Sequence, residues 1–194
     1  MEAIRRPLHN SWVDYCQEIP DDIKVSHETF ERLWNLHPEE LGKVKVYNTE
    51  HAPRWFQNYG RSYTFSKVVH KEEPITDPYL VHLLHWVQTH SGRPYNGLLV
   101  NWYQDGSHSI GWHSDKENEL VPGSCIYSFS FGQERDFHIR KRDTQGDVIK
   151  LKLCNNSLLI MGENMQSHYQ HSVPKRALSS CPGRRINVTM RLFK

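Results

Sequence analysis

The feature that most constrains the fold is a series of short apolar segments in the second half of the 194-residue chain. Turn residues such as Asp105-Gly106, Pro122-Gly123 and Asn155-Asn156 separate these segments, as is typical of consecutive strands. The expected strands lie near Leu98–Tyr103, Ile110–Ser114, Cys125–Phe131, Asp136–Arg140, Val148–Leu153, Ser157–Met161, His168–Ser172 and Arg185–Phe193. Strands at this spacing predict a jelly roll, also called a double-stranded β-helix, in which two sheets face each other.

The first half of the chain is expected to hold helices and hairpins. The elements expected are an irregular arm over 1–25, a helix over 26–36, a hairpin region over 44–65 and a helix over 77–92. Ser26 can cap the first helix. Asp77 can cap the second, with Pro78 in its first position and Gly92 at its end. The prediction is therefore one mainly β unit with N-terminal helices.

Composition excludes several classes of protein. Lys and Arg number 24 against 22 Asp and Glu, a balance that argues against a wholly electrostatic nucleic-acid binder but allows a local basic patch such as 140–142. No run approaches the roughly 18 apolar residues of a membrane span, and the N-terminus lacks a secretory pattern. The four cysteines form no C-x-x-C pair, which favours reduced thiols in the nucleus or cytoplasm.

The last expected strand carries polar side chains on one face. Because side chains alternate along a strand, the residues Arg185, Asn187, Thr189 and Arg191 share a face. The opposite face is apolar. Two interpretations fit this pattern: a solvated outer face, or a polar pocket inside the jelly roll.

A second pattern, His113-Ser114-Asp115, predicts a metal site. The two side chains at i and i+2 share a face, and a distant second histidine would complete the two-His-one-carboxylate triad of non-haem Fe(II) oxygenases. Either His168 or His171 can supply it. A hydrogen-bonded His–Asp pair without a metal is the simpler alternative for an isolated H-x-D. The second histidine is followed further along the chain by R-x-N-x-T-x-R, the pattern of 185–191. This order favours the oxygenase interpretation, because arginine suits bidentate recognition of a dicarboxylate co-substrate.

These motifs together resemble a known family. The stretches that carry the resemblance are NWYQDGSHSIGWHSDKENELVPGSCIYSFSFGQERDF, HSVP and RRINVTMR. The chain resembles the AlkB family of Fe(II)/2-oxoglutarate-dependent dioxygenases over roughly 44–193, and most of all its DNA-repair members of the homologue 2 and 3 type. The resemblance implies a dioxygenase domain over 44–194 with nucleotide-recognition hairpins, preceded by an arm and helix over 1–43.

The resemblance also implies a set of site residues. It assigns the iron ligands to His113, Asp115 and His171, the last through the match to H-S-x-P. It assigns 2-oxoglutarate contacts to Asn101, Tyr103, Arg185, Asn187, Thr189 and Arg191. It assigns substrate contacts to Tyr47 as a wedge in duplex DNA, Arg54 at the backbone, Tyr63, Phe65 and Ser66 in the hairpin over the damaged base, and Glu117 at the base edge. Lys116 stands where the nearest family members have an acidic residue.

The activity implied is oxidative demethylation of N-alkylated bases such as 1-methyladenine and 3-methylcytosine in DNA. It uses Fe(II), O2 and 2-oxoglutarate, and releases succinate, CO2 and formaldehyde. The expected partner of a monomeric enzyme is alkylated DNA, with no membrane involved. Two alternatives stay open: the same chemistry on RNA or single strands, and an oxygenase acting on a protein or small molecule.

Overall fold

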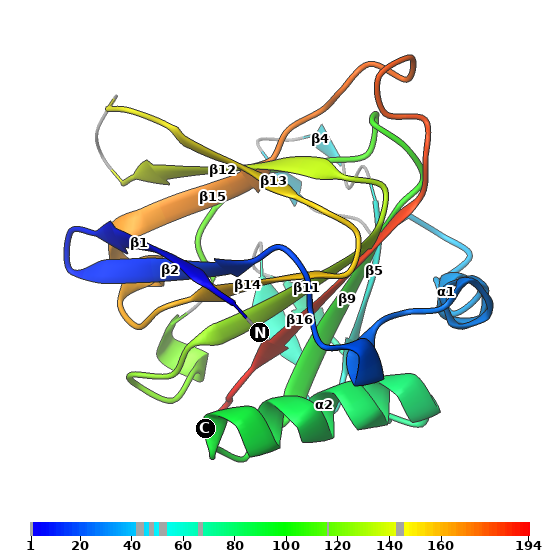
Figure 1. The fold of residues 1–194 in the computed structure, drawn as a ribbon, viewed down its shortest axis with the longest axis horizontal. Coiled ribbons are helices and arrows are strands. Elements are labelled where there is room, and N and C mark those ends of the chain that lie inside the picture. The colour runs from blue at the N-terminus through cyan, green and yellow to red at the C-terminus, as the bar shows by residue number, and fades with distance from the viewer. Residues whose placement is uncertain are drawn as a thin grey trace.

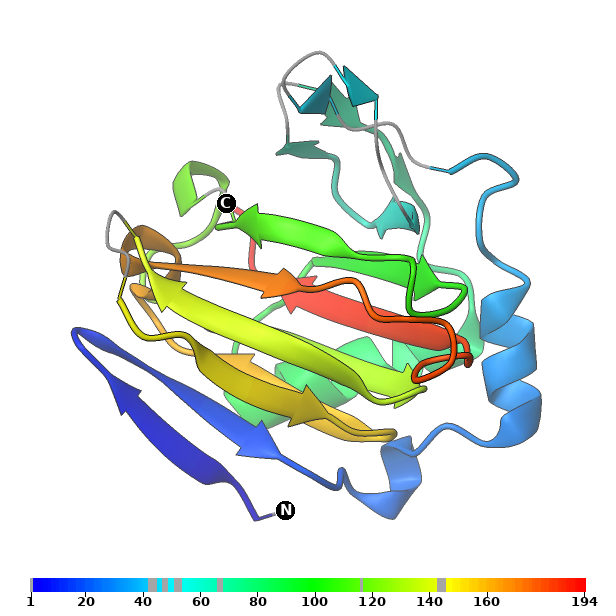
Figure 2. The same ribbon diagram turned by 90° about the horizontal axis from the view of Figure 1, so that it is seen from above.

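Two β-sheets packed face to face form the body of the protein (Figure 1). The computed structural model describes residues 2–41, 45–46, 49–50, 54–65, 68–115, 117–142 and 146–194. The large sheet has the order β1-β2-β14-β11-β16-β9-β5-β8, and the small sheet has the order β10-β15-β12-β13, seen from above in Figure 2. The expected jelly roll is confirmed.

The strands of the large sheet are β1 (Ile4–Leu8), β2 (Ser11–Cys16), β5 (Trp55–Tyr59), β8 (Glu72–Glu73), β9 (Gly97–Tyr103), β11 (Ile126–Gly132), β14 (Ser157–Met161) and β16 (Arg185–Arg191). Those of the small sheet are β10 (Ile110–His113), β12 (Arg135–Lys141), β13 (Ile149–Leu153) and β15 (Tyr169–Val173). The hairpins are β3 (Lys45–Val46) with β4 (Thr49–Glu50), and β6 (Tyr63–Phe65) with β7 (Val68–His70). The helices are α1 (His27–Trp34), α2 (Pro78–Ser91) and α3 (Met165–His168), with short 3-10 turns at Asp21–Ile23 and Glu117–Glu119.

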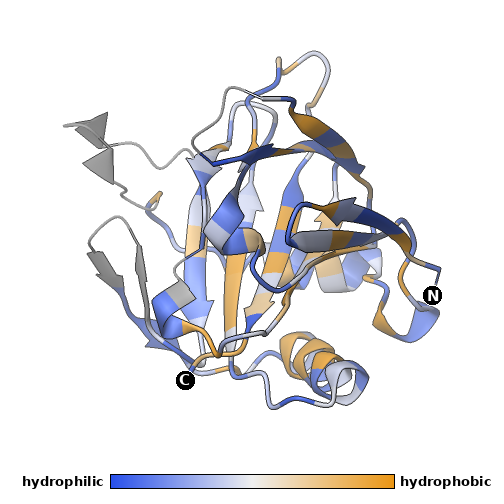
Figure 3. Cartoon of the chain, turned by 90° about the vertical axis from the view of Figure 1, so that its left-hand side faces the viewer, coloured by the Kyte–Doolittle hydropathy of each residue, from blue (hydrophilic) through white to orange (hydrophobic). Residues whose placement is uncertain are grey.

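Helix α2 covers the outer face of the large sheet, and its ends are those predicted. The Asp77 carboxylate accepts hydrogen bonds from the backbone N–H groups of Tyr79 and Leu80, and Gly92 takes the left-handed conformation that ends the helix. Its apolar side chains pack on alternate residues of the sheet, such as Trp102 and Val188. The orange and blue bands along these strands in Figure 3 follow from the same alternation. No described helix is long and apolar enough to cross a membrane.

The expected irregular arm over 1–25 is wrong, because this segment contains a hairpin of the large sheet. Strand β2 pairs antiparallel with both β1 and β14. Val13 and Cys16 of β2 are fully buried. The apolar residues of Ser11–Cys16 could have predicted a strand, but they lie within a mostly polar segment, which favoured the prediction of an irregular arm. The Tyr169 hydroxyl accepts a hydrogen bond of 2.8 Å from the backbone N–H of His9, which fastens the hairpin turn to the small sheet.

The expected hairpin region over 44–65 holds β3 with β4 and the first strand of the β6–β7 hairpin. Strand β5 lies between these hairpins in sequence and pairs with β9 in the large sheet, and the two hairpins project on one side (Figure 2). One strand boundary needs correction. The strand expected to begin at His168 begins at Tyr169, because His168 ends the short helix α3.

Candidate metal centre and co-substrate pocket

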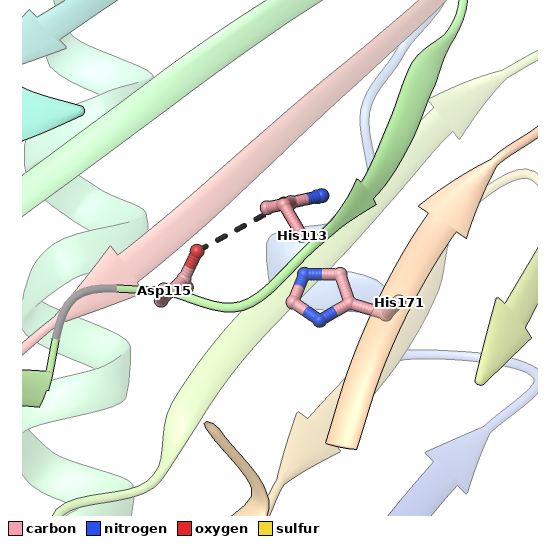
Figure 4. A group of neighbouring side chains, drawn as sticks. All are labelled: His113, Asp115 and His171. Atoms are coloured by element: carbon pink, nitrogen blue, oxygen red, sulfur yellow. Dashed lines mark ion pairs between the residues drawn. The ribbon is translucent and has the colours of Figure 1, made fainter. Parts of the chain in front are cut away.

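Strand register brings the two predicted histidine ligands together. His113 lies directly opposite His171 in the antiparallel pair β10–β15, and their ring centroids are 4.2 Å apart. Asp115 follows β10, so its carboxylate reaches the same point (Figure 4). One ligand atom from each of the three residues lies within 4.8 Å of the others. His168 is not part of this cluster, so the structure favours His171 as the second histidine.

The Asp115 side chain is held from several directions. Its Oδ2 accepts from Nε of Arg191 at 2.9 Å and lies 2.8 Å from Nη2 of the same group. Its backbone N–H donates to Oε1 of Gln166 at 2.9 Å. The other oxygen, Oδ1, faces Nε2 of His113 at 4.0 Å. Arg191 therefore orients the carboxylate and leaves Oδ1 toward the histidines.

The protonation states suit a divalent metal. Burial, and after it the nearby charge of His113, lower the pKa of His171 to about 3. Desolvation also lowers the pKa of His113, whose Nδ1 donates to the carbonyl of Gly111 at 2.9 Å and so leaves Nε2 with its lone pair. Burial opposes ionisation of Asp115, but Arg191 and the histidines hold its pKa below the ordinary value. Two neutral imidazoles and one carboxylate are the ligand states that metal binding requires.

The polar face of β16 points into the jelly roll, so the solvated-face interpretation is wrong and the interior interpretation is favoured. Arg185, Asn187, Thr189 and Arg191 are all at least nine-tenths buried. They pair with β11, where Ser128 and Ser130 occupy the facing positions. The contacts are Arg185 Nη2 to Ser130 Oγ at 2.9 Å, Asn187 Nδ2 to Ser128 Oγ at 2.9 Å and to the Phe129 carbonyl at 2.7 Å, and Thr189 Oγ1 to Asn187 Oδ1 at 3.1 Å.

Arg185 tests whether this pocket fits a carboxylate. The side chain is 1% exposed, and its Nε and Nη1 have no hydrogen-bond partner although both are buried. Its Cζ lies 4.9 Å from the centroid of the Tyr103 ring. Buried guanidinium N–H groups without acceptors are costly, and a carboxylate is the acceptor that best matches their planar fork. The residues present therefore fit a carboxylate co-substrate beside the metal cluster.

Arg54 lies in a different place from the one expected. The resemblance implies a contact with the nucleic-acid backbone, but Arg54 is 5% exposed and its Nε donates to Asn101 Oδ1 at 2.7 Å. Asn101 belongs to β9 and faces the pocket from beside β16. Arg54 therefore borders the predicted co-substrate pocket from the segment that follows the first hairpin.

Other predicted substrate residues cannot be placed by their side chains. Tyr47 and Ser66 lie outside the described residues. Tyr63 and Phe65 are described only as strand positions of β6, and Glu117 only as part of the turn over 117–119. Their roles stay predictions.

Sequence reasoning missed four residues of the site. Ser128 and Ser130 alternate with aromatic residues along β11, a period-2 signal that could have revealed them. Arg135 and Gln166 gave no such signal, because each reaches the site from the end of an element. Gln166 holds the Asp115 backbone, and Arg135 lies 5.5 Å from the Tyr103 ring.

The comparison with known proteins agrees with this geometry. The model of the 2OG-Fe(II) oxygenase superfamily matches residues 9–191, which is nearly the whole chain, so the chain belongs to that superfamily. Within it, the sequence relatives place the chain in the AlkB family, as the motifs indicated. The mouse "DNA oxidative demethylase ALKBH2" is 39% identical over 162 residues, covering 78% of this chain and 66% of the relative. The human "Alpha-ketoglutarate-dependent dioxygenase alkB homolog 3" is 36% identical over 180 residues, covering 88% and 62%.

A solved structure confirms the fold alone. "The structure of OsALKBH1" superimposes with a TM-score of 0.62 at 17% identity, covering 97% of this chain and all of that one. The chain spans just under two thirds of the length of the curated relatives described above.

Proposed function

We propose that this chain oxidatively demethylates N-alkylated bases, of the 1-methyladenine and 3-methylcytosine type, in DNA. The observation that carries the proposal is the His113, Asp115 and His171 cluster, which lies inside a jelly roll whose polar pocket contains the acceptor-free N–H groups of Arg185. The names of the ALKBH2 relatives support demethylation of DNA as the activity.

The described residues have separate tasks in this reaction. His113, Asp115 and His171 would hold Fe(II), and Arg185 would receive the distal carboxylate of 2-oxoglutarate. When bound, the iron and 2-oxoglutarate supply the O2-dependent oxidation that removes the N-methyl group as formaldehyde and yields succinate and CO2. Arg191 keeps one carboxylate oxygen of Asp115 directed toward the ligand cluster. Asn101, Tyr103, Asn187 and Thr189 complete the wall of the co-substrate pocket.

The hairpins would present the base. The methyl groups concerned lie on the base-pairing edge, so the base must leave the duplex, at a cost of a few kcal/mol. Tyr47 would fill the gap in the duplex, and Phe65 would stack on the flipped base beside Tyr63 and Ser66. Stacking on an aromatic ring contributes about 1–3 kcal/mol per base. Glu117 would contact the base edge.

The decisive experiment measures formaldehyde and succinate release with Fe(II), 2-oxoglutarate and an oligonucleotide that contains one 1-methyladenine. Wild-type protein should release both products in equal amounts, and His171→Ala should release neither. An unmethylated oligonucleotide of the same sequence serves as the control. Succinate without demethylated base from every nucleic acid tried would contradict the proposal and favour a protein or small-molecule substrate.

The form of the nucleic acid is tested by the same assay. Duplex DNA, single-stranded DNA and RNA carrying the same lesion are compared for wild type and for Tyr47→Ala. If Tyr47 is a wedge, its loss should reduce duplex repair much more than single-strand repair. Equal losses would remove the wedge assignment, and a preference for RNA would replace DNA as the substrate.

A further inference from the structure

A buried arginine that sequence reasoning did not assign to the site ties together the two strands that carry the histidine ligands. Arg135, the first residue of β12, is 2% exposed. Its Nη1 donates to the carbonyl of Asp105 at 3.1 Å, and its Nη2 donates to the carbonyls of His108 and Pro174, both at 2.8 Å. The first two carbonyls precede β10, which carries His113, and the third follows β15, which carries His171.

Arg135 is also the second positive charge beside one aromatic ring. Its Cζ lies 5.5 Å from the Tyr103 ring, and the Cζ of Arg185 lies 4.9 Å from the same ring. Tyr103 therefore contacts both guanidinium groups, with Arg185 donating toward β11 and Arg135 donating toward the loops before β10 and after β15. The two guanidinium groups therefore adjoin the same aromatic ring.

The charge of Arg135 is not cancelled by its hydrogen bonds. All three acceptors are neutral backbone carbonyls, and its buried Nε has no partner. Among the described residues, the fully buried charged side chains are Arg54, Asp115, Arg135, Arg185 and Arg191. The single carboxylate in this set is paired with Arg191. The pKa of the Asp105 carboxylate is lowered by its hydrogen bond with Ser107 and also by the charge of Arg135, but Asp105 is only partly buried. The described interior therefore still has an excess of positive charge, which a bound dianion would neutralise.

We propose that Arg135 is a positioning and specificity-determining residue that makes the pocket select a dicarboxylate over a monocarboxylate. This inference rests on the proposed co-substrate site at Arg185. Arg185 makes the direct contact with the distal carboxylate, and Arg135 acts on it through space from its own position near the Tyr103 ring. A unit charge about 10 Å away at an effective dielectric constant near 20 changes affinity by roughly tenfold.

The test compares two ligands that differ in one charge. Dissociation constants of 2-oxoglutarate and of its 5-methyl ester are measured for the full chain loaded with Mn(II) in the absence of O2. Wild type should prefer the dicarboxylate. Arg135→Gln should lower that preference by roughly tenfold, mainly through weaker binding of 2-oxoglutarate. Arg135→Lys should keep most of the preference because it keeps the charge. The control is Arg184→Gln, because Arg184 is adjacent to Arg185 in sequence but pairs with Glu31, and this variant should leave the preference unchanged.

Each other result has a defined meaning. An unchanged preference in Arg135→Gln would overturn the inference while leaving the Arg185 site in place. Equal weakening of both ligands in Arg135→Gln and Arg135→Lys would assign Arg135 a structural role. Failure of both Arg135→Gln and Arg135→Met to fold would do the same. Either result would overturn the inference. If wild type shows no preference between the two ligands, the proposed co-substrate site itself is wrong.

Discussion

Arg191 on β16 holds Oδ2 of Asp115 through Nε at 2.9 Å and Nη2 at 2.8 Å, so a residue of the large sheet orients a metal ligand that follows β10 of the small sheet. The resemblance assigns Arg191 to the co-substrate, and the structure shows that Arg191 also pairs with the metal ligand Asp115. Both side chains are about 5% exposed, so each buried charge is compensated by its partner rather than by water. The geometry of the metal centre thus depends on how the two sheets pack.

Removing the charge of Arg191 should destabilise the metal-free protein. Arg191→Met leaves the buried Asp115 carboxylate without its cation, which costs about 3–5 kcal/mol. Because the folded-state pKa of Asp115 is lowered, its pairing stabilises the fold above the unfolded pKa of about 4 and is lost as pH falls through the folded value. Urea unfolding should therefore show a deficit at neutral pH that shrinks in acid. A deficit independent of pH would indicate lost packing rather than lost pairing.

His171, and not His168, should control metal binding. His171→Ala removes one of three ligands and should weaken Co(II) binding by more than the roughly 10–100-fold expected for an outer-shell partner. His168→Ala is the matched control, because His168 lies three residues away at the end of α3 and outside the cluster. Titration followed by the visible absorption of Co(II) measures both. Loss of binding in His168→Ala alone would reverse the ligand assignment.

Arg185 should determine the affinity for 2-oxoglutarate. A hydrogen bond to a charged group contributes about 1.5–3 kcal/mol, so Arg185→Ala should weaken binding by about 10–100-fold. Arg185→Lys should recover little, since an ammonium lacks the planar fork. Arg184→Ala provides the comparison, because Arg184 is adjacent in sequence but pairs with Glu31 near α1. Calorimetry with the Mn(II)-loaded protein gives the constants, and equal affinities in wild type and Arg185→Ala would refute the assignment.

The N-terminal hairpin should contribute to stability without contributing to chemistry. Tyr169→Phe removes two hydrogen bonds and keeps the ring, because the Tyr169 hydroxyl accepts from the His9 N–H at 2.8 Å and donates to the His9 carbonyl at 3.3 Å. A loss of about 1 kcal/mol is expected, which corresponds to roughly 2–4 °C in melting temperature for a chain of this size. Turnover should be unchanged. A melting temperature equal to that of wild type would show that the hairpin is held by strand pairing alone.

Local patterns were sufficient to predict the jelly roll, α2 and the metal-ligand candidates His113, Asp115 and either His168 or His171. Period-2 alternation and turn residues are properties of neighbouring residues, so the strands and the shared face of Arg185, Asn187, Thr189 and Arg191 could be read directly. The capping pattern at Asp77 and Pro78 is equally local. The alternation could not show which face points inward, because a polar face is compatible with solvent and with a pocket.

Only the tertiary structure decided which residues meet. The resemblance already assigned His171, but the contact of His171 with His113 depends on strand register, and the pairing of Arg191 with Asp115 depends on how two sheets pack. Arg135 reaches Tyr103 from the end of a strand, and Arg54 reaches Asn101 across the β5–β9 pair, neither at a spacing that the sequence can signal. Sequence determines local conformation through short-range sterics and hydrogen bonding, whereas contacts between distant residues are set by the packing of whole elements, to which every residue of the core contributes.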